Sequence, residues 1–118
     1  MEKMMKYSEN GFWVEPINDD LYRIGLSDKG QDDLGDVAFF EFLASENVTT
    51  EDSLFSVEAS KATTDLASPL NGRVVEWHHA LEKQPELLNS TDKENTWVAI
   101  LSHVERSEYD ALLDTSGL

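Results

Sequence analysis

Short runs of apolar residues recur along the chain and are separated by residues typical of turns. Many of these runs are rich in β-branched and aromatic side chains, which favour strands. The runs that predict strands are residues 12–17, 21–27, 36–43, 51–60, 65–77 and 96–104. Asn18, Asp19 and Asp20 suit the turn of a hairpin between the first two. The pattern therefore predicts a mainly β fold, a sandwich or flattened barrel of two sheets.

Two short helices are expected beside these strands. Asp28 is suited to cap the first helix and Gly35 to end it. A second helix is predicted over residues 107–113 with Ser107 as its cap, close to the end of the chain. Residues 78–89 are expected to form a loop with one helical turn, and a bend is expected within 65–77, at its proline and glycine.

Length and charge narrow the possible functions. A chain of 118 residues suits a single domain spanning residues 1–118. Its formal net charge of −15 repels phosphate backbones and anionic membranes and favours basic protein partners, so neither nucleic acid nor membrane is expected as a partner. The sequence has no apolar run of membrane-spanning length and no signal-peptide pattern, which predicts a cytoplasmic protein. It has no cysteine, which excludes disulfides and thiolate chemistry.

Few residues indicate catalysis or metal binding. His78 and His79 would point to opposite faces of a strand, and His103 follows an apolar strand, so no metal site is predicted. The acidic residues within 28–36 lack the spacing of a calcium loop. No serine lies in a Gly-x-Ser-x-Gly elbow. The sequence therefore does not support a catalytic triad.

One lysine has an unusual setting. The segment SKATT, which contains Lys61, separates the strand-like SLFSVEA from DLASPL and lacks long apolar side chains. It therefore predicts the tip of a β-hairpin with Lys61 exposed. Taken alone, such a lysine is most often a solvated charge at a strand end.

The residues around Lys61 change that interpretation. The segment VEASKATTDLASPLNG resembles the lipoyl-lysine hairpin of glycine cleavage H proteins and of the lipoyl domains of 2-oxoacid dehydrogenases. The matching positions are Val57, Glu58, Lys61, Ala62, Asp65, Ser68, Pro69 and Gly72. Biotin carriers typically have methionine on both sides of the lysine, whereas this chain has Ser60 and Ala62. The resemblance implies lipoate attached covalently to Lys61 and recognition of Glu58 by a lipoate ligase.

Further segments resemble the H-protein family in particular. Leu34, Gly35 and Asp36 match its Leu-Gly-Asp motif, and WVEP, QPELLN, TWVAIL and YDALLD match other segments in order. The resemblance implies a lipoyl-type flattened barrel that carries intermediates and catalyses nothing itself. It also implies glycine decarboxylase, aminomethyltransferase and dihydrolipoyl dehydrogenase as partners.

The chain departs from the family pattern at several segments, and this leaves alternatives open. Gly11 and Phe12 stand where the family usually has His-Glu before the tryptophan of its first strand, FLASEN lacks the usual Leu-Pro and Gly, and WVAIL lacks a frequent lysine. STDKENTW replaces a Pro-Tyr-Gly-x-Gly-Trp segment. One alternative is an H-like lipoylated scaffold or lipoyl relay that works with a lipoate ligase and with sirtuin and macrodomain enzymes of ADP-ribosylation. Asp28 and Asp32 would then be the candidate ADP-ribose acceptors. Another alternative is a binding module in which Lys61 is unmodified.

Overall fold

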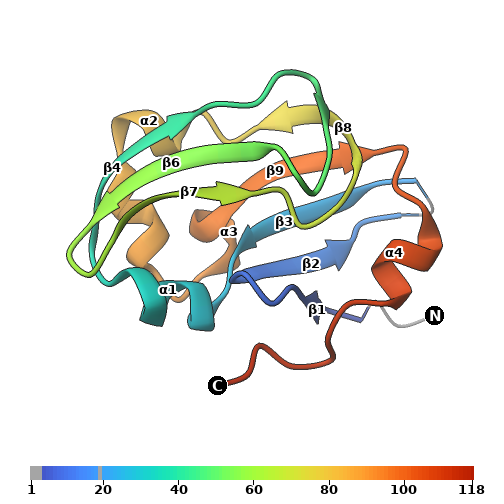
Figure 1. Cartoon of the computed structure of the whole chain (residues 1–118), viewed down its shortest axis with the longest axis horizontal. Helices are drawn as coiled ribbons and strands as arrows, with labels where there is room; N and C mark the ends of the chain where they lie inside the picture. The colour runs from blue at the N-terminus through green and yellow to red at the C-terminus, as the bar shows by residue number, and fades with distance from the viewer. Residues whose placement is uncertain (1–3, 19) are drawn as a thin grey trace.

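The computed structural model describes residues 4–18 and 20–118, and their strands form two antiparallel sheets (Figure 1). The larger sheet has the order β1-β2-β3-β9-β8-β5 and the smaller one the order β4-β6-β7. The strands are β1 (Lys6–Tyr7), β2 (Phe12–Pro16), β3 (Tyr22–Leu26), β4 (Val37–Phe42), β5 (Asn47–Val48), β6 (Ser53–Ala59), β7 (Thr63–Ala67), β8 (Gly72–Trp77) and β9 (Trp97–Ser102). The predicted mainly β fold is confirmed.

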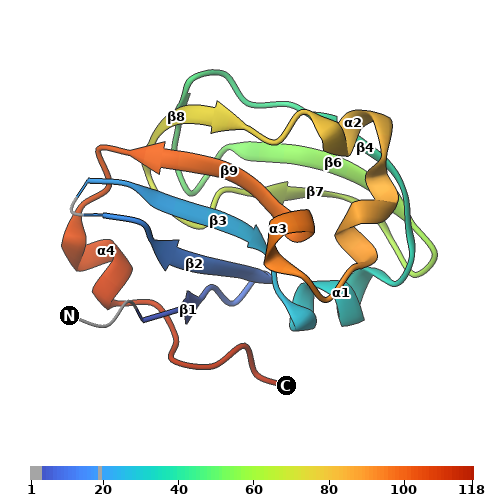
Figure 2. The same ribbon diagram turned by 180° about the vertical axis from the view of Figure 1, so that it is seen from behind.

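Short helical segments lie between the strands and after the last one. They are α1 (Asp28–Leu34), α2 (Ala80–Lys83), the 3-10 helix η1 (Pro85–Asn89), α3 (Lys93–Thr96) and α4 (Arg106–Asp110). Figure 2 shows α2, α3 and the segment joining them at one end of the larger sheet, with α4 at the other end. Among the described residues, no helix is long and apolar enough to cross a membrane.

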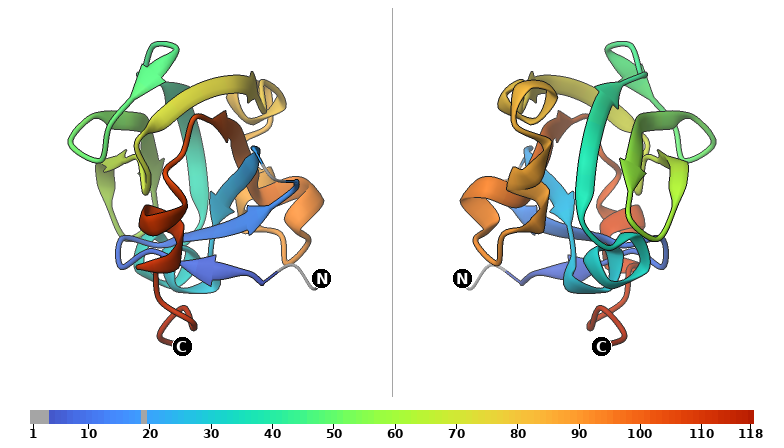
Figure 3. Two further views of the ribbon diagram at one scale, coloured as in Figure 1. Left: turned by 90° about the vertical axis from the view of Figure 1, so that its right-hand side faces the viewer. Right: turned by 90° about the vertical axis from the view of Figure 1, so that its left-hand side faces the viewer.

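The core lies between the two sheets, which Figure 3 shows edge-on. Phe40 and Phe55 come from β4 and β6, and their rings stack with centroids 4.7 Å apart. Phe12 of β2 meets Phe55 edge-on at 5.8 Å, so the aromatic contact joins the two sheets. Burial of such large rings supplies much of the driving force for folding.

β2 and β3 form the predicted hairpin, and its antiparallel register places Phe12 opposite Leu26. Oδ1 of Asn18 accepts hydrogen bonds from the main-chain N–H of Asp20 and Leu21, which is how an asparagine side chain supports a turn. Asp19, part of the predicted turn, lies outside the described residues.

The bend predicted within 65–77 carries the chain from one sheet to the other. β7 ends in the smaller sheet and β8 begins at Gly72 in the larger one. A side chain at Gly72 would place its Cβ 2.7 Å from the carbonyl oxygen of Ser102 and 3.1 Å from Cγ2 of Val104. Glycine is therefore required for the close approach of β8 to β9 and the segment after it.

Both residues predicted to cap the start of a helix, Asp28 and Ser107, are wrong. Ser27 caps α1, and its Oγ accepts the N–H of Gly30 at 3.2 Å, while Asp28 is already helical. α4 begins at Arg106 after Glu105, which makes no capping hydrogen bond through its side chain, and Ser107 lies inside the helix. Serine and aspartate have similar preferences for the capping position, so the residue types alone do not fix the start of a helix.

Candidate functional site

The tip of the β6–β7 hairpin is a turn of two residues, Ser60 and Lys61. The N–H of Ala59 donates to the carbonyl oxygen of Ala62 at 2.8 Å and closes the turn. Both turn residues are exposed, and neither has a positive φ. The structure thus places Lys61 at the tip of a regular hairpin, which lies at the opposite end of the molecule from α4 (Figure 1).

Hydrogen bonds hold this tip against residues 34–36, which are the last residue of α1 and the two residues after it. The main-chain N–H of Lys61 donates to the carbonyl oxygen of Leu34 at 2.8 Å. The main-chain N–H of Ser60 donates to the main-chain carbonyl oxygen of Asp36 at 2.9 Å. In return, Oγ of Ser60 accepts the N–H of Asp36 at 2.9 Å. Gly35 has a φ of +76°, and a Cβ there would overlap Oγ of Ser60. The Leu-Gly-Asp motif is therefore the seat of the hairpin tip.

The Lys61 side chain lies along the end of α1. Its Nζ donates a hydrogen bond to the main-chain carbonyl oxygen of Asp32 at 3.0 Å. The partial negative charge at the C-terminal end of a helix favours a cation there. In the described part of the chain, Lys61 forms no ion pair with a carboxylate. The amine is thus held by main chain alone and is open to solvent.

The other predicted site residues, Glu58, Asp32 and Asp28, lie on β6 and α1 and differ in how close they come to Lys61. Glu58 is exposed on β6, in the last cross-strand pair before the turn, opposite Thr63. Asp32 is exposed in α1, and its carbonyl group contacts Lys61. Asp28 is exposed at the start of α1, where its Oδ1 accepts the N–H of Lys29 at 2.8 Å. The structure therefore brings Asp32 to Lys61 but leaves Asp28 at the other end of the helix.

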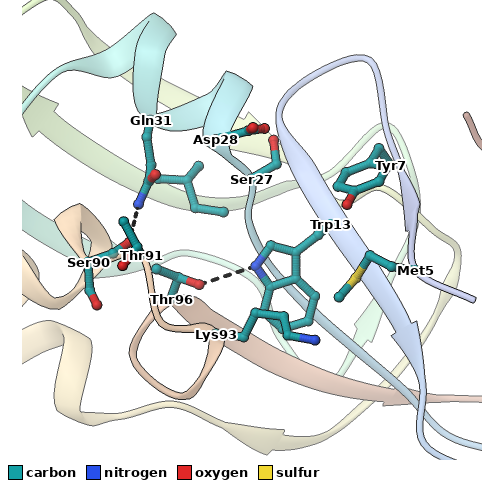
Figure 4. Close-up of a pocket in the computed structure, with 11 residues that line it drawn as sticks. Met5, Tyr7, Trp13, Ser27, Asp28, Gln31, Ser90, Thr91, Lys93 and Thr96 are labelled. Carbon is teal, nitrogen blue, oxygen red and sulfur yellow. Dashed lines mark hydrogen bonds between the residues drawn. The ribbon is translucent and has the colours of Figure 1, made fainter. Parts of the chain in front are cut away.

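A surface cavity of about 190 Å³ lies near the start of α1 (Figure 4), and Lys61 is not among its lining residues. Nε1 of Trp13 donates to Oγ1 of Thr96 at 3.2 Å, and Nε2 of Gln31 donates to the carbonyl oxygen of Ser90 at 2.6 Å. These hydrogen bonds tie the segment that contains α3 to β2 and α1. The polar groups of this wall therefore hold the fold together.

A charged network reinforces the same segment. Arg23 on β3 pairs with Glu15 at 3.0 Å and with Glu94 at 3.1 Å, and its guanidinium lies 5.6 Å from the ring centre of Trp13. Lys93 also binds Glu15, at 3.1 Å. Burial acts to raise the pKa of Glu15, but the hydrogen bonds and charges of Lys93 and Arg23 outweigh it and lower that pKa. Burial acts to lower the pKa of Arg23, but the hydrogen bonds and charges of Glu94 and Glu15 outweigh it and raise that pKa.

The histidines have structural settings. β8 ends at Trp77, so His78 and His79 lie in the predicted loop that follows the strand. His78 stacks on Trp97 at 4.3 Å, and its Nδ1 lies 2.6 Å from the carbonyl oxygen of that residue. Nδ1 of His103 lies 2.8 Å from Oγ of its neighbour Ser102. Within residues 4–18 and 20–118, no group of three or more His, Asp or Glu side chains is arranged to hold a metal ion.

Comparison with known proteins identifies the family of the chain. The family model for the glycine cleavage H-protein matches residues 5–117. The chain belongs to this family. Among curated members, the glycine cleavage system H protein of Clostridioides difficile is 39% identical over 110 residues, covering 92% of this chain and 87% of that protein. The family resemblance predicted from the sequence is confirmed.

Two further relatives and one solved structure extend the comparison. The glycine cleavage system H-like protein of Staphylococcus aureus is 36% identical and covers 92% of this chain and 97% of that protein. The H protein of Listeria welshimeri is 37% identical, and the match covers 98% of this chain and 92% of that protein. The crystal structure of an H protein from Mycobacterium marinum superposes with a TM-score of 0.72 at 21% identity and covers 86% of this chain and 85% of that chain. At that identity the superposition supports the glycine cleavage H-protein fold.

Proposed function

We propose that this chain is a lipoyl carrier of the glycine cleavage H-protein family, with lipoate attached to Nζ of Lys61. The observation that carries the proposal is the exposed Lys61 amine at the tip of a hairpin seated by hydrogen bonds on the segment from Leu34 to Asp36. Family membership supports it independently.

The residues present fit such a group. An amide at Nζ removes the positive charge of Lys61, and no carboxylate among the described residues loses an ion-pair partner by that change. The remaining amide N–H keeps one donor, which suits the single contact to the carbonyl oxygen of Asp32. When bound, lipoate supplies a disulfide that can be reduced and can carry a substituent, chemistry that a chain without cysteine lacks.

The role of the chain is then to hold the lipoyl arm and present it to partner enzymes. Ser60 and Gly35 fix where the arm begins, and the lysine and lipoate together reach roughly 10–14 Å by standard bond lengths. The carrier catalyses no step, and lipoate ligase loads it in the cytoplasm with Glu58 as a recognition residue. Glycine decarboxylase, aminomethyltransferase and dihydrolipoyl dehydrogenase are the proposed partners of the loaded carrier.

Intact-protein mass spectrometry tests the proposal. The unmodified protein is incubated with lipoate–protein ligase, ATP and lipoate. We expect one lipoyl group per chain. Chains that remain unmodified beside a fully loaded control H protein overturn the proposal and favour the alternative of an unmodified binding module.

A second candidate is the H-like lipoylated scaffold or relay that works with sirtuin and macrodomain enzymes. One observation favours it: the segment with Lys93 and Glu94 departs from the family pattern. The H-like protein of Staphylococcus aureus is 36% identical to the chain, and the two H proteins are 37% and 39% identical, so identity alone does not separate the two candidates. Exposed Asp28 and Asp32 are its candidate ADP-ribose acceptors.

Glycine–bicarbonate exchange separates the two candidates. Lipoylated protein is assayed with glycine decarboxylase beside a standard H protein at matched lipoylation. Equal rates assign the chain to glycine cleavage. A rate near background, with normal loading by ligase, assigns it to the scaffold role.

A further inference from the structure

The outer face of the three-stranded sheet begins beside the Lys61 turn. The cross-strand register aligns Phe39 of β4, Glu58 of β6 and Thr63 of β7 in one row. The next row contains Glu41 and Asp65. We call these five residues the hairpin face. All five are exposed, whereas the intervening Phe40 and Val57 point into the core.

Phe39 is unusual on this face because it is a large apolar residue with 45% of its surface exposed. The next residue, Phe40, is only 2% exposed and packs on Phe55, so the strand already supplies an aromatic ring to the core. The exposed part of the ring gains nothing from burial when the chain folds. It can contribute a great deal to an interface, where aromatic side chains are enriched.

The charged residues of the hairpin face, Glu41, Glu58 and Asp65, are all acidic. Glu41, Glu58 and Asp65 form no ion pair with any cation in the described part of the chain. Other cations of the protein, such as Lys29 and Arg73, are paired with carboxylates elsewhere. A complementary partner therefore presents an apolar recess for Phe39 with lysine or arginine side chains around it.

The position of the face identifies which partner must cover it. Glu58 and Thr63 are the last pair before the turn, so their row lies within about 10 Å of the tip at 3.3 Å per residue. An enzyme that forms a bond at Nζ of Lys61 has to enclose the tip itself. Enzymes that act at the far end of the lipoyl arm work roughly 10–14 Å further out and need not touch the strands.

We propose that the hairpin face is the docking surface for the lipoate ligase, with Phe39 as its apolar anchor and Glu41 and Asp65 as its charged flank. The inference rests on the proposed lipoylation of Lys61 and deepens it. Phe39 acts by binding and orienting the carrier and has no part in the chemistry. Its loss should therefore change the KM for the carrier while kcat remains unchanged.

Ligation kinetics of Phe39→Ala test the proposal, with Val75→Ala as the matched control. Val75 is 51% exposed on β8 of the other sheet, so the control removes an equally exposed apolar side chain away from Lys61. We expect the KM for Phe39→Ala to rise roughly tenfold, as for an interface anchor, with kcat unchanged. Val75→Ala should retain the KM of the parent protein, and Phe39→Tyr should restore most of the loss. Equal effects of Phe39→Ala and Val75→Ala overturn the proposal.

A second measurement uses charge and does not depend on the folding of Phe39→Ala. The double variant Glu41→Gln, Asp65→Asn should show a weaker dependence of kcat/KM on salt than the parent protein, because the steering charges are gone. An unchanged salt dependence contradicts the charged flank. If the parent protein is not lipoylated at Lys61, the proposed function fails. If it is lipoylated and the Phe39 variants keep its KM, this inference alone fails.

Discussion

Nζ of Lys61 donates a hydrogen bond to the main-chain carbonyl oxygen of Asp32, at 3.0 Å. Because the acceptor is main chain, a substitution of the Asp32 side chain leaves it in place. The contact instead depends on where α1 ends and on how the hairpin tip sits on it. The geometry of the candidate site is therefore set by Gly35 and Ser60, which hold those two elements together.

Replacement of Gly35 by alanine should destabilise the protein by roughly 1–3 kcal/mol, because the residue has a φ of +76° and its Cβ would overlap Oγ of Ser60. Gly117→Ala is the matched control, since Gly117 also has a positive φ, +96°, but its nearest neighbouring atom is 3.8 Å away. Urea unfolding should show a smaller loss for the control. Equal losses would mean that the contact with Ser60 contributes nothing.

Lys61→Ala should change the free energy of unfolding by no more than about 0.5 kcal/mol, because the side chain is exposed and makes one hydrogen bond. Gly72→Val should cost clearly more, because its Cβ would approach the carbonyl oxygen of Ser102 to 2.7 Å. Thermal unfolding of both variants gives the comparison. Similar melting shifts would contradict the exposed placement of Lys61.

The sequence was sufficient for the parts of the fold that depend on local pattern. The strand runs, the β2–β3 hairpin and Gly35 at the end of α1 follow from periodicity and turn residues. The two-residue strands β1 and β5 and the one-turn helix α3 were not predicted. Such short elements are fixed by tertiary contacts, as when β1 pairs with β2, and carry little local signal.

The site was predictable only in part, for a related reason. The sequence identified Lys61 and Glu58 and the Leu-Gly-Asp motif, but it gave no sign that the motif holds the hairpin tip. That contact joins residues far apart in sequence through main-chain groups, which every residue type possesses. Ser60 could have been noticed as a hydroxyl beside Lys61. In the sequence, Phe39 is one of the apolar residues of the run 36–43, and its exposure depends on the register with β6.

Ser27→Ala should destabilise α1 by about 1 kcal/mol, because Oγ of Ser27 caps the helix through the N–H of Gly30. Asp28→Ala should cost less, since Asp28 accepts only the N–H of the adjacent Lys29. Chemical denaturation of the two variants tests the assigned cap. A larger loss for Asp28→Ala would restore aspartate as the capping residue.

Glu15→Gln should destabilise the protein near neutral pH and much less in acid. Lys93 and Arg23 lower the pKa of Glu15 in the folded protein despite its partial burial. The stability it contributes is therefore present above its unfolded pKa of about 4.3 and is lost as the pH falls through the lower folded value. Urea unfolding at about pH 7 and about pH 3 should show the difference between parent and variant shrinking. Exposed Glu51→Gln is the control, and a difference that stays constant with pH would contradict the network.

We propose that Lys61, among all the lysines of the chain, carries the lipoyl group. Peptide mapping by tandem mass spectrometry after incubation with lipoate–protein ligase, ATP and lipoate tests it directly, with Lys61→Arg treated in parallel. We predict a single lipoylated peptide that contains Lys61 and no modification of Lys61→Arg. A lipoyl group on another lysine, or full modification of Lys61→Arg, would contradict the account.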